Sequence, residues 1–213
     1  MPSSQPAYTV RHATTDDIPS LTTIVPRAFH PTNPYILKLF PNTPALQQWW
    51  SNIFASKISN PKTSHLLTAC SSETTDSLGL LSMQHFSPTD TGAGLYTSFP
   101  PTPDHDASSY TAVASGLARA REEMVAGSEH FVIELFGVDH AAKGLGLGLL
   151  LLRKACEIAD AAGLPIFVMA NASAQGIYPR VGFELRRVEV MPGELKYEEF
   201  MLVRPAQKGG RRS

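Results

Sequence analysis

The sequence predicts an α/β (α+β) domain in which helices flank a single mixed sheet. Strand-like and helix-like segments mix along the whole chain, which supports this class. A run of β-forming residues at 130–139 is typical of a strand buried on both faces. The 213 residues suit one domain and no linker interrupts them, so residues 1–205 are expected to form a single domain.

The first half of the chain is expected to begin with a strand at 8–14 and a helix at 14–29. Thr14 or Thr15 can cap this helix, and Pro26 should kink or end it. A second helix is expected at 45–58. Two strands, "SHLLTACSS" and "SLGLLSMQHFS", should then pair through a polar turn.

In the second half, a loop at 87–107 is expected to precede a helix at 107–127 and the buried strand. A glycine-rich segment follows, and then an amphipathic helix that ends at about Ala162, before Gly163 and Pro165. The remaining elements are expected in the order strand, short helix, strand, strand, at 165–170, 173–181, 183–191 and 197–205. Residues 206–213 should form a disordered basic tail.

Composition disfavours several classes of protein. The net charge of −1 and the lack of a basic stripe disfavour nucleic-acid binding. The longest apolar run, between Lys143 and Arg153, falls far short of the ~20 residues that a membrane span needs. The N-terminal segment lacks secretory features, and Cys70 and Cys156 have no disulfide or metal-ligand spacing. We therefore expect a cytoplasmic protein with both cysteines buried.

Three glycines, Gly144, Gly146 and Gly148, alternate with leucines directly before the amphipathic helix. Glycine weakens a helix or strand interior by about 0.5–1 kcal/mol relative to alanine, so an offsetting role is expected. The dinucleotide fingerprint GxGxxG fails because its third glycine would fall on Leu149 or Leu151, and the Gly-Lys-Ser/Thr of a P-loop is missing. The pattern fits a helix N-terminus whose free backbone N–H groups bind a pyrophosphate.

This segment resembles motif A of the GCN5-related N-acetyltransferase (GNAT) superfamily, which has a strand ending in Val, four residues, Q/R-x-x-G-x-G/A and a helix. Here Val138 is followed by "DHAA" and then by "KGLGLG". Lys143 stands where the family usually has Arg or Gln. Because the backbone carries the pyrophosphate contacts in the family, this departure changes little.

A second stretch, "FVMANASAQGIYPRVGFE", resembles motif B of the same superfamily. The residues that fall on its pattern are Asn171, Ala174, Tyr178, Gly182 and Phe183. Pro179 is unusual because it removes a helical hydrogen bond just after the tyrosine. The two motifs cover residues 130–184 at the family's spacing, and the element order extends the resemblance to the whole chain, most closely to uncharacterised fungal members.

The resemblance implies a GNAT fold, a mostly antiparallel sheet whose fourth and fifth strands splay apart to hold acetyl-CoA as cosubstrate. Pantetheine would pair with the fourth strand, and the pyrophosphate would rest on the amides of 143–149. The implied cosubstrate-binding residues are Phe136, Gly137, Val138, Lys143, Gly144, Leu145, Gly146, Leu147, Gly148, Leu149, Asn171 and Tyr178. No metal ion is implied.

Acetyl transfer to an amine requires loss of a proton from the amine, a donor for the developing oxyanion and a proton for the leaving thiolate. By similarity to the family, Tyr178 would protonate the thiolate. The backbone N–H of Val138 would be the oxyanion donor.

The sequence offers three candidates for the base. A period of two predicts His130, Val132, Glu134, Phe136 and Val138 on one face of the strand. Glu134 falls where arylalkylamine-acetylating members carry a catalytic histidine, so it is the candidate base. A structural role is its alternative, and His130 or a water chain could replace it as base.

The acceptor site is expected from residues 27–58 and the loop before the helix at 107–127. Aromatic residues could line a groove there, although most are expected to be core: Phe29, Tyr35, Phe40, Trp49, Trp50 and Phe54. The predicted function is acetyl-CoA-dependent N-acetylation of a small-molecule primary amine. Its alternatives are a non-catalytic CoA-binding sensor or scaffold and acyl transfer to a hydroxyl. A homodimer through the last strands is common in the family but is not indicated by this sequence.

Overall fold

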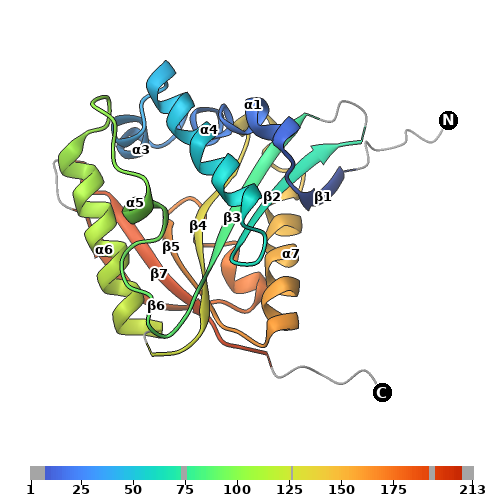
Figure 1. Ribbon diagram of the computed structural model, residues 1–213, viewed down its shortest axis with the longest axis vertical. Coiled ribbons are helices and arrows are strands. Elements are labelled where there is room, and N and C mark those ends of the chain that lie inside the picture. Colours follow the sequence, from blue (N-terminus) through green and yellow to red (C-terminus); the bar gives the residue numbers. More distant parts are fainter. Residues whose placement is uncertain (1–7, 73–75, 126, 192–194, 208–213) are drawn as a thin grey trace.

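The computed structural model describes residues 8–72, 76–125, 127–191 and 195–207. They form one seven-stranded sheet in the order β1-β2-β3-β4-β5-β7-β6 (Figure 1). The strands are β1 (Tyr8–His12), β2 (Ser64–Ser71), β3 (Ser77–Phe86), β4 (His130–Val138), β5 (Ile166–Asn171), β6 (Glu184–Val190) and β7 (Glu198–Arg204). Neighbouring strands are antiparallel except β4 and β5, which are parallel. The predicted α/β class with a mixed, mostly antiparallel sheet is confirmed.

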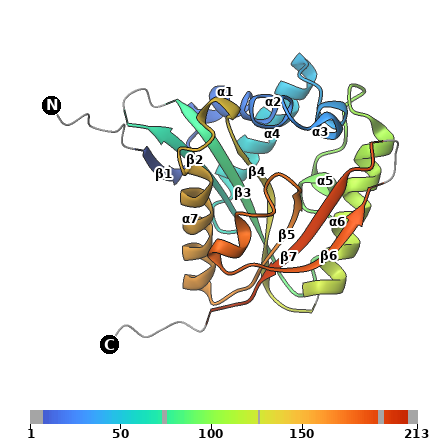
Figure 2. The same ribbon diagram turned by 180° about the vertical axis from the view of Figure 1, so that it is seen from behind.

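Helices cover both faces of this sheet, as Figures 1 and 2 show from opposite sides. The helices are α1 (Ile18–Leu21), α2 (Ile24–Phe29), α3 (Pro34–Leu39), α4 (Pro44–Ser59), α5 (Leu95–Ser98), α6 (Ala107–Val125) and α7 (Leu147–Ala162). Three 3-10 turns lie at Thr15–Asp17, His140–Ala142 and Tyr178–Val181. Helix α7 packs on one face, against β1 to β4, whereas α1, α2 and α4 pack on the other face beside α6. The sheet is therefore the middle layer between two apolar cores.

The predicted helix at 14–29 is interrupted, but before Pro26 and not at it. Thr14 caps the first turn as expected, and its backbone N–H donates to the Asp17 carboxylate at 2.7 Å. The chain then breaks at Thr22–Thr23, and Pro26 lies in the first turns of α2. The reason is steric, because a proline ring clashes with the carbonyl of the residue four positions earlier, here Thr22.

Other predicted elements differ in detail. The short helix expected at 173–181 contracts to the turn at Tyr178–Val181, and the loop at 87–107 contains the short helix α5. Both cysteines are free and buried, as expected. Residues 208–213 of the expected tail, and most of the turn at 73–76, lie outside the described residues.

Strands β4 and β5 pair over only part of their length. Three residue pairs join them, from Phe131 with Ile166 to Ile133 with Val168. Beyond these pairs the two strands diverge within the described chain, while β5 continues to pair with β7 up to Asn171. The sheet thus opens at the carboxyl ends of its two parallel strands.

Strand β4 has a β-bulge at Glu134. On β3, Ser82 pairs with Leu135, but the next residue, Met83, pairs with Ile133, so one residue of β4 has no counterpart. A bulge shifts the alternation of side chains by one position.

The bulge overturns the prediction that five residues of β4 share one face. Phe136 and Val138 pack against the α7 side of the sheet. Val132 packs on the opposite side, towards α6, and Glu134 bonds groups from helices on that side. The period of two holds only up to the bulge, so His130, Val132 and Glu134 are separated from Phe136 and Val138.

Candidate active site

The glycine segment connects β4 to α7 through two left-handed residues. Gly144 has a φ of 91° and Gly146, the N-cap of α7, has a φ of 78°. Residues with a Cβ rarely adopt these angles, so both positions favour glycine. No atom of the described residues comes within 4 Å of where a Cβ would stand at either position, which leaves the backbone open to a ligand.

Gly148 has a different reason to lack a side chain. A Cβ there would lie 3.1 Å from Ile177 and 3.3 Å from Phe136. It stands in the first turn of α7, where backbone N–H groups have no helical carbonyl to pair with. These N–H groups, together with the positive end of the helix dipole, fit the diphosphate of a CoA-type molecule.

An outer cleft of 530 Å³ runs along this segment between β4 and β5. It collects most of the predicted cosubstrate-binding residues: Phe136, Gly137, Val138, Lys143, Gly144, Gly146, Leu147, Gly148, Leu149 and Asn171. Leu145 is not among the lining residues and is 47% exposed. The structure adds Arg180, an exposed cation at the cleft that neither motif pattern had marked.

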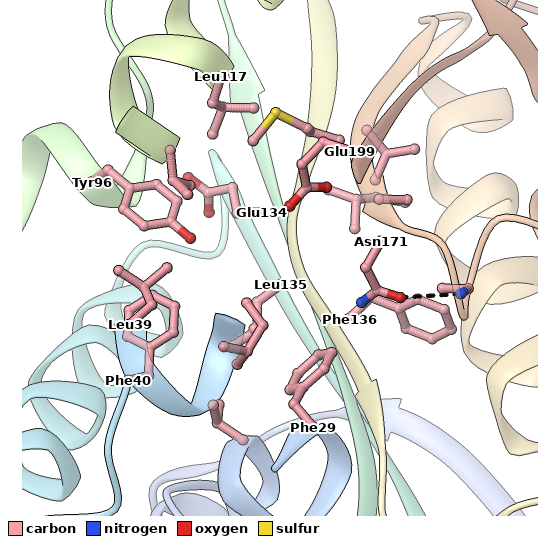
Figure 3. A pocket seen from close by; sticks show the side chains of 18 of the residues that line it. Phe29, Leu39, Phe40, Tyr96, Leu117, Glu134, Leu135, Phe136, Asn171 and Glu199 are labelled. Carbon is pink, nitrogen blue, oxygen red and sulfur yellow. Dashed lines mark hydrogen bonds between the residues drawn. The ribbon is translucent and has the colours of Figure 1, made fainter. Parts of the chain in front are cut away.

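An inner cavity continues from this cleft through the gap in the sheet. The two share Phe29, Phe136, Asn171 and Ala174 as lining residues. The inner cavity reaches β7 and the helices α5 and α6, and its walls are mainly aromatic and aliphatic (Figure 3). Among the described lining residues its only carboxylates are Glu134 and Glu199.

Tyr178 lines the inner cavity but not the outer cleft, and it contacts Phe136, which lines both. Its side chain is 2% exposed and makes edge contacts with the rings of Phe136 and Phe183. Burial raises the pKa of the Tyr178 phenol above its usual value, with a smaller contribution from the Glu199 charge. The hydroxyl therefore keeps its proton at neutral pH and is able to donate it.

Glu134 lines the inner cavity, but other groups of the chain hold both of its oxygens. Oε2 accepts a hydrogen bond from the Lys57 ammonium at 2.5 Å, and Oε1 accepts one from the Leu95 N–H at 2.8 Å. The two charged side chains are 6% and 0% exposed. A Cβ at Gly94 would lie 2.1 Å from Oε1, so the loop before α5 closes tightly over the carboxylate.

Glu199, on β7, was not among the predicted site residues. It is 5% exposed, and Figure 3 shows its carboxylate pointing into the cavity between Glu134 and Asn171. Its Oε2 atom has no hydrogen-bond partner in the described part of the chain. Burial raises the pKa of Glu199 to about 8, although hydrogen bonding by the Tyr197 hydroxyl partly opposes this shift.

The other candidates from the sequence lie mostly away from the cavity. His130 is 1% exposed, stacks on Phe86 and does not line the cavity, and burial lowers its pKa. Phe29 and Phe40 line the inner cavity. The other predicted aromatics belong to the core on that side of the sheet, as expected: Tyr35, Trp49, Trp50 and Phe54.

Comparison with known families agrees with this geometry. Residues 100–183 match the family model of the Acetyltransferase (GNAT) family. The matched region includes β4, the glycine segment, α7, β5 and Tyr178. The resemblance to the GNAT superfamily is thereby confirmed over residues 100–183. Acetyl-CoA is the cosubstrate of this family.

Solved structures share the fold along nearly the whole chain. Arylalkylamine N-acetyltransferase 2 from Aedes aegypti matches with a TM-score of 0.65 and 16% identity, over 94% of this chain and 99% of that one. A histone acetyltransferase HPA2 and related acetyltransferase from Corynebacterium glutamicum matches at 0.58 and 19%, over 95% and 98%. The PaiA N-acetyltransferase from Thermoplasma acidophilum, solved with coenzyme A, matches at 0.54 and 10%, over 93% and 99%.

At these identities the likeness concerns the fold alone. No curated protein matches the chain. Within the described residues, no helix is both long and apolar enough to cross a membrane.

Proposed function

We propose that this protein transfers the acetyl group of acetyl-CoA directly to the primary amine of a small molecule. One observation carries the proposal: an anion-binding helix N-terminus and a carboxylate-lined cavity meet in one gap between β4 and β5. The helix N-terminus suits the anionic cosubstrate, and the carboxylate-lined cavity suits a cationic acceptor. Direct transfer requires both substrates to reach the same point, which the shared lining residues allow.

On the cosubstrate side, backbone groups of residues 143–149 would hold the diphosphate. The free edge of β4 beyond Ile133 would pair with the pantetheine, because β5 has already diverged there. The backbone N–H of Val138 would stabilise the oxyanion. Tyr178, buried and protonated, would give its proton to the departing thiolate.

The sequence names Glu134 as the candidate base, but its contacts favour a different role. One oxygen of this carboxylate accepts from the Lys57 ammonium and the other accepts from the Leu95 N–H, so either would have to leave its partner to reach an acceptor amine. We propose that Glu134 fixes α5 and the cavity wall, which is the structural alternative for this residue. His130 does not line the cavity, so we do not propose it as the base in place of Glu134.

The acceptor is proposed to be small because the inner cavity has only 80 Å³ open to the centre of a water molecule, whereas the outer cleft has 530 Å³ by the same measure. An extended peptide would need an open groove, whereas a primary amine on a short apolar substituent fits. Phe29, Phe40 and Tyr96 supply the aromatic surface for such a substituent.

The test combines calorimetric titration of acetyl-CoA with a thiol-release assay over a panel of amines and alcohols. Micromolar binding with competition by CoA, and thiol release with an amine, would support the proposal. Tyr178→Phe should keep the binding and lower kcat by about 100-fold. Binding without thiol release from any acceptor would contradict the proposed transfer and favour a non-catalytic CoA-binding role.

A further inference from the structure

The inner cavity holds a carboxyl group for which the described chain supplies no counter-charge. Lys57 pairs with Glu134, but no Lys, Arg or His occurs among the described residues that line the cavity. A buried carboxylate without a partner is strongly unfavourable, so such groups either stay protonated or receive a cation. Glu199 has neither a counter-ion nor a partner for Oε2 in the described structure.

The residues around Glu199 position its side chain but leave its Oε2 atom without a hydrogen-bond partner in the described structure. Asn171 pairs with it across β5 and β7, and the same asparagine lines both the inner cavity and the outer cleft. Tyr197, two residues earlier, stacks on Tyr35 at 4.3 Å and accepts a hydrogen bond of 3.4 Å from Asn33. The carboxyl group of Glu199 thus stands on β7, and its partner across the sheet, Asn171, lines the outer cleft.

We propose that Glu199 binds the ammonium group of the acceptor and takes its proton, so that the acceptors are alkylamines that are protonated at neutral pH. This inference rests on the proposed function. The ammonium N–H bond breaks as its proton moves to the Glu199 carboxylate, which leaves a neutral amine and a carboxylic acid. The amine nitrogen then bonds the acetyl carbon, the C–S bond breaks, and the thiolate accepts a proton from Tyr178. The second amine proton returns to the Tyr178 phenolate, and Glu199 releases its proton to solvent.

Burial supports this role through the proton affinity of the carboxyl group. A pKa near 8 lets Glu199 accept a proton more readily than an ordinary glutamate, and yet ionise at mildly alkaline pH. The titratable groups that face it are Tyr35 from α3, Tyr96 from α5, Tyr178 from the 3-10 turn, Tyr197 beside β7 and Glu134 from β4. On β6, Glu189 pairs with it across the strands but bonds Arg119 and Arg187. The phenols stay neutral near pH 8, so Glu199 should control the pH dependence.

The experiment compares Glu199→Gln with the wild type on two acceptors. The first is 2-phenylethylamine, and the second is its β,β-difluoro analogue, whose amine is far less basic. With 2-phenylethylamine, kcat/KM should fall by about 100-fold or more in the variant. With the difluoro analogue the loss should be at least tenfold smaller, because much of that amine is already neutral. Acetyl-CoA affinity by calorimetry should not change.

The pH profile separates a base from a merely structural residue. The wild-type kcat/KM should rise with an apparent pKa near 8, and this limb should vanish in Glu199→Gln but persist in Glu134→Gln, whatever the activity of that variant. Glu198→Gln, which changes the exposed neighbour on the same strand, is the matched control and should behave as the wild type.

Provided that the wild type is active, either of two results would overturn the assignment of Glu199. One is an equal loss of kcat/KM with both amines in Glu199→Gln. The other is that the rise of kcat/KM near pH 8 vanishes in Glu134→Gln instead. A wild type that releases no thiol with any amine would instead overturn the proposed function itself. The two failures are therefore distinguishable.

Discussion

Two glutamates share the inner cavity, yet their environments differ in kind. Glu134 accepts hydrogen bonds from an ammonium group and a backbone N–H. Glu199 meets phenols and apolar walls, and burial favours its neutral form. Two carboxyl groups in contrasting environments can take separate roles, one as a fixed charge and one as a proton acceptor.

The first prediction concerns the ion pair of Lys57 and Glu134. Glu134→Gln should lower the free energy of unfolding by about 3 kcal/mol, because a buried ammonium group loses its counter-charge. Adding Lys57→Met should restore part of this loss, since the uncompensated charge is then removed as well. Urea denaturation of the two single variants and the double variant measures the coupling.

The control for this prediction is an exposed pair. Lys154 and Glu157 lie 3.0 Å apart on α7, and their side chains are 42% and 65% exposed. Glu157→Gln should change stability by less than about 0.5 kcal/mol. If Glu134→Gln were equally mild, the buried ion pair would contribute nothing, and the structural role given to Glu134 would be wrong.

The second prediction concerns the pH dependence of stability that Glu199 creates. Its folded-state pKa of about 8 lies above the ordinary value of 4.5, so between these values the folded state binds more protons than the unfolded state. Stability contributed by this group is present at low pH and is lost as pH rises through 8. Glu199→Gln cannot ionise, so its advantage over the wild type should grow from pH 5 to pH 9, by on the order of 3 kcal/mol.

Thermal unfolding in buffers free of amines measures this difference, because an amine that binds Glu199 would mask it. A constant difference between the wild type and Glu199→Gln from pH 5 to pH 9 would show that Glu199 titrates alike in both states. It would also remove the electrostatic support for its part as a base.

At the scale of elements, the glycines of the glycine segment lower local stability but leave the backbone open to a ligand. Gly146→Ala should lower stability by about 1 kcal/mol, because alanine is strained at a φ of 78°. It should also weaken acetyl-CoA binding at least tenfold, since relief of this strain moves the first N–H groups of α7. Calorimetry and urea denaturation on the same preparation measure the two effects.

Gly176→Ala is the matched control for the glycine segment. Its backbone is not left-handed, and in the part of the chain that the structure describes no atom lies within 4 Å of where its Cβ would stand. This variant should bind acetyl-CoA as the wild type does. Equal affinity in Gly146→Ala would contradict the proposal that the start of α7 holds the diphosphate.

Local patterns were sufficient to predict most of the elements. Helix α7 begins within the glycine segment and ends at Ala162, as its capping and apolar period indicate. The break near Pro26 could be predicted only roughly, because the clash acts one turn earlier, at Thr22. The bulge at Glu134 has no sequence signature of its own, since it depends on how β3 pairs with β4.

Glu199 could have been found from the sequence, but only in part. The period of two in "YEEFMLVR" places Glu199 on the same face as Met201 and Val203, which are buried. A carboxylate at an inward position of a strand is a signal of function. Glu199 reaches the cavity beside Glu134 because β7 lies next to β5. The motifs in the matched region 100–183 do not specify this strand order.

At the scale of the whole molecule, the sheet joins the two cores into one unit. Neighbouring residues of β3 face opposite layers: Leu80 packs with the helices of the first half, and Leu81 packs with α7. Strands β2, β3, β4, β5 and β7 each contribute buried residues to both layers, so neither layer can lose its packing without disturbing the other. The site lies where this sheet is weakest, in the gap where β4 and β5 no longer pair.

This arrangement predicts a single cooperative unfolding transition for residues 1–205, the proposed single domain. Each layer has its own probe. Trp49 and Trp50 lie in the core on one side of the sheet, and Cys156, a buried residue of α7, lies in the core on the other side. Tryptophan fluorescence and thiol labelling, the latter in a Cys70→Ala background, should give the same urea midpoint.

Acetyl-CoA at 100 times its dissociation constant should raise the unfolding free energy by about 2.7 kcal/mol for both probes alike. Its proposed site contacts both strands that border the gap, so its binding energy acts on the sheet that the layers share. Separate midpoints, or stabilisation of only one probe, would mean that the two layers unfold independently. The gap between β4 and β5 would then be a boundary between two folding units, and not an opening within one domain.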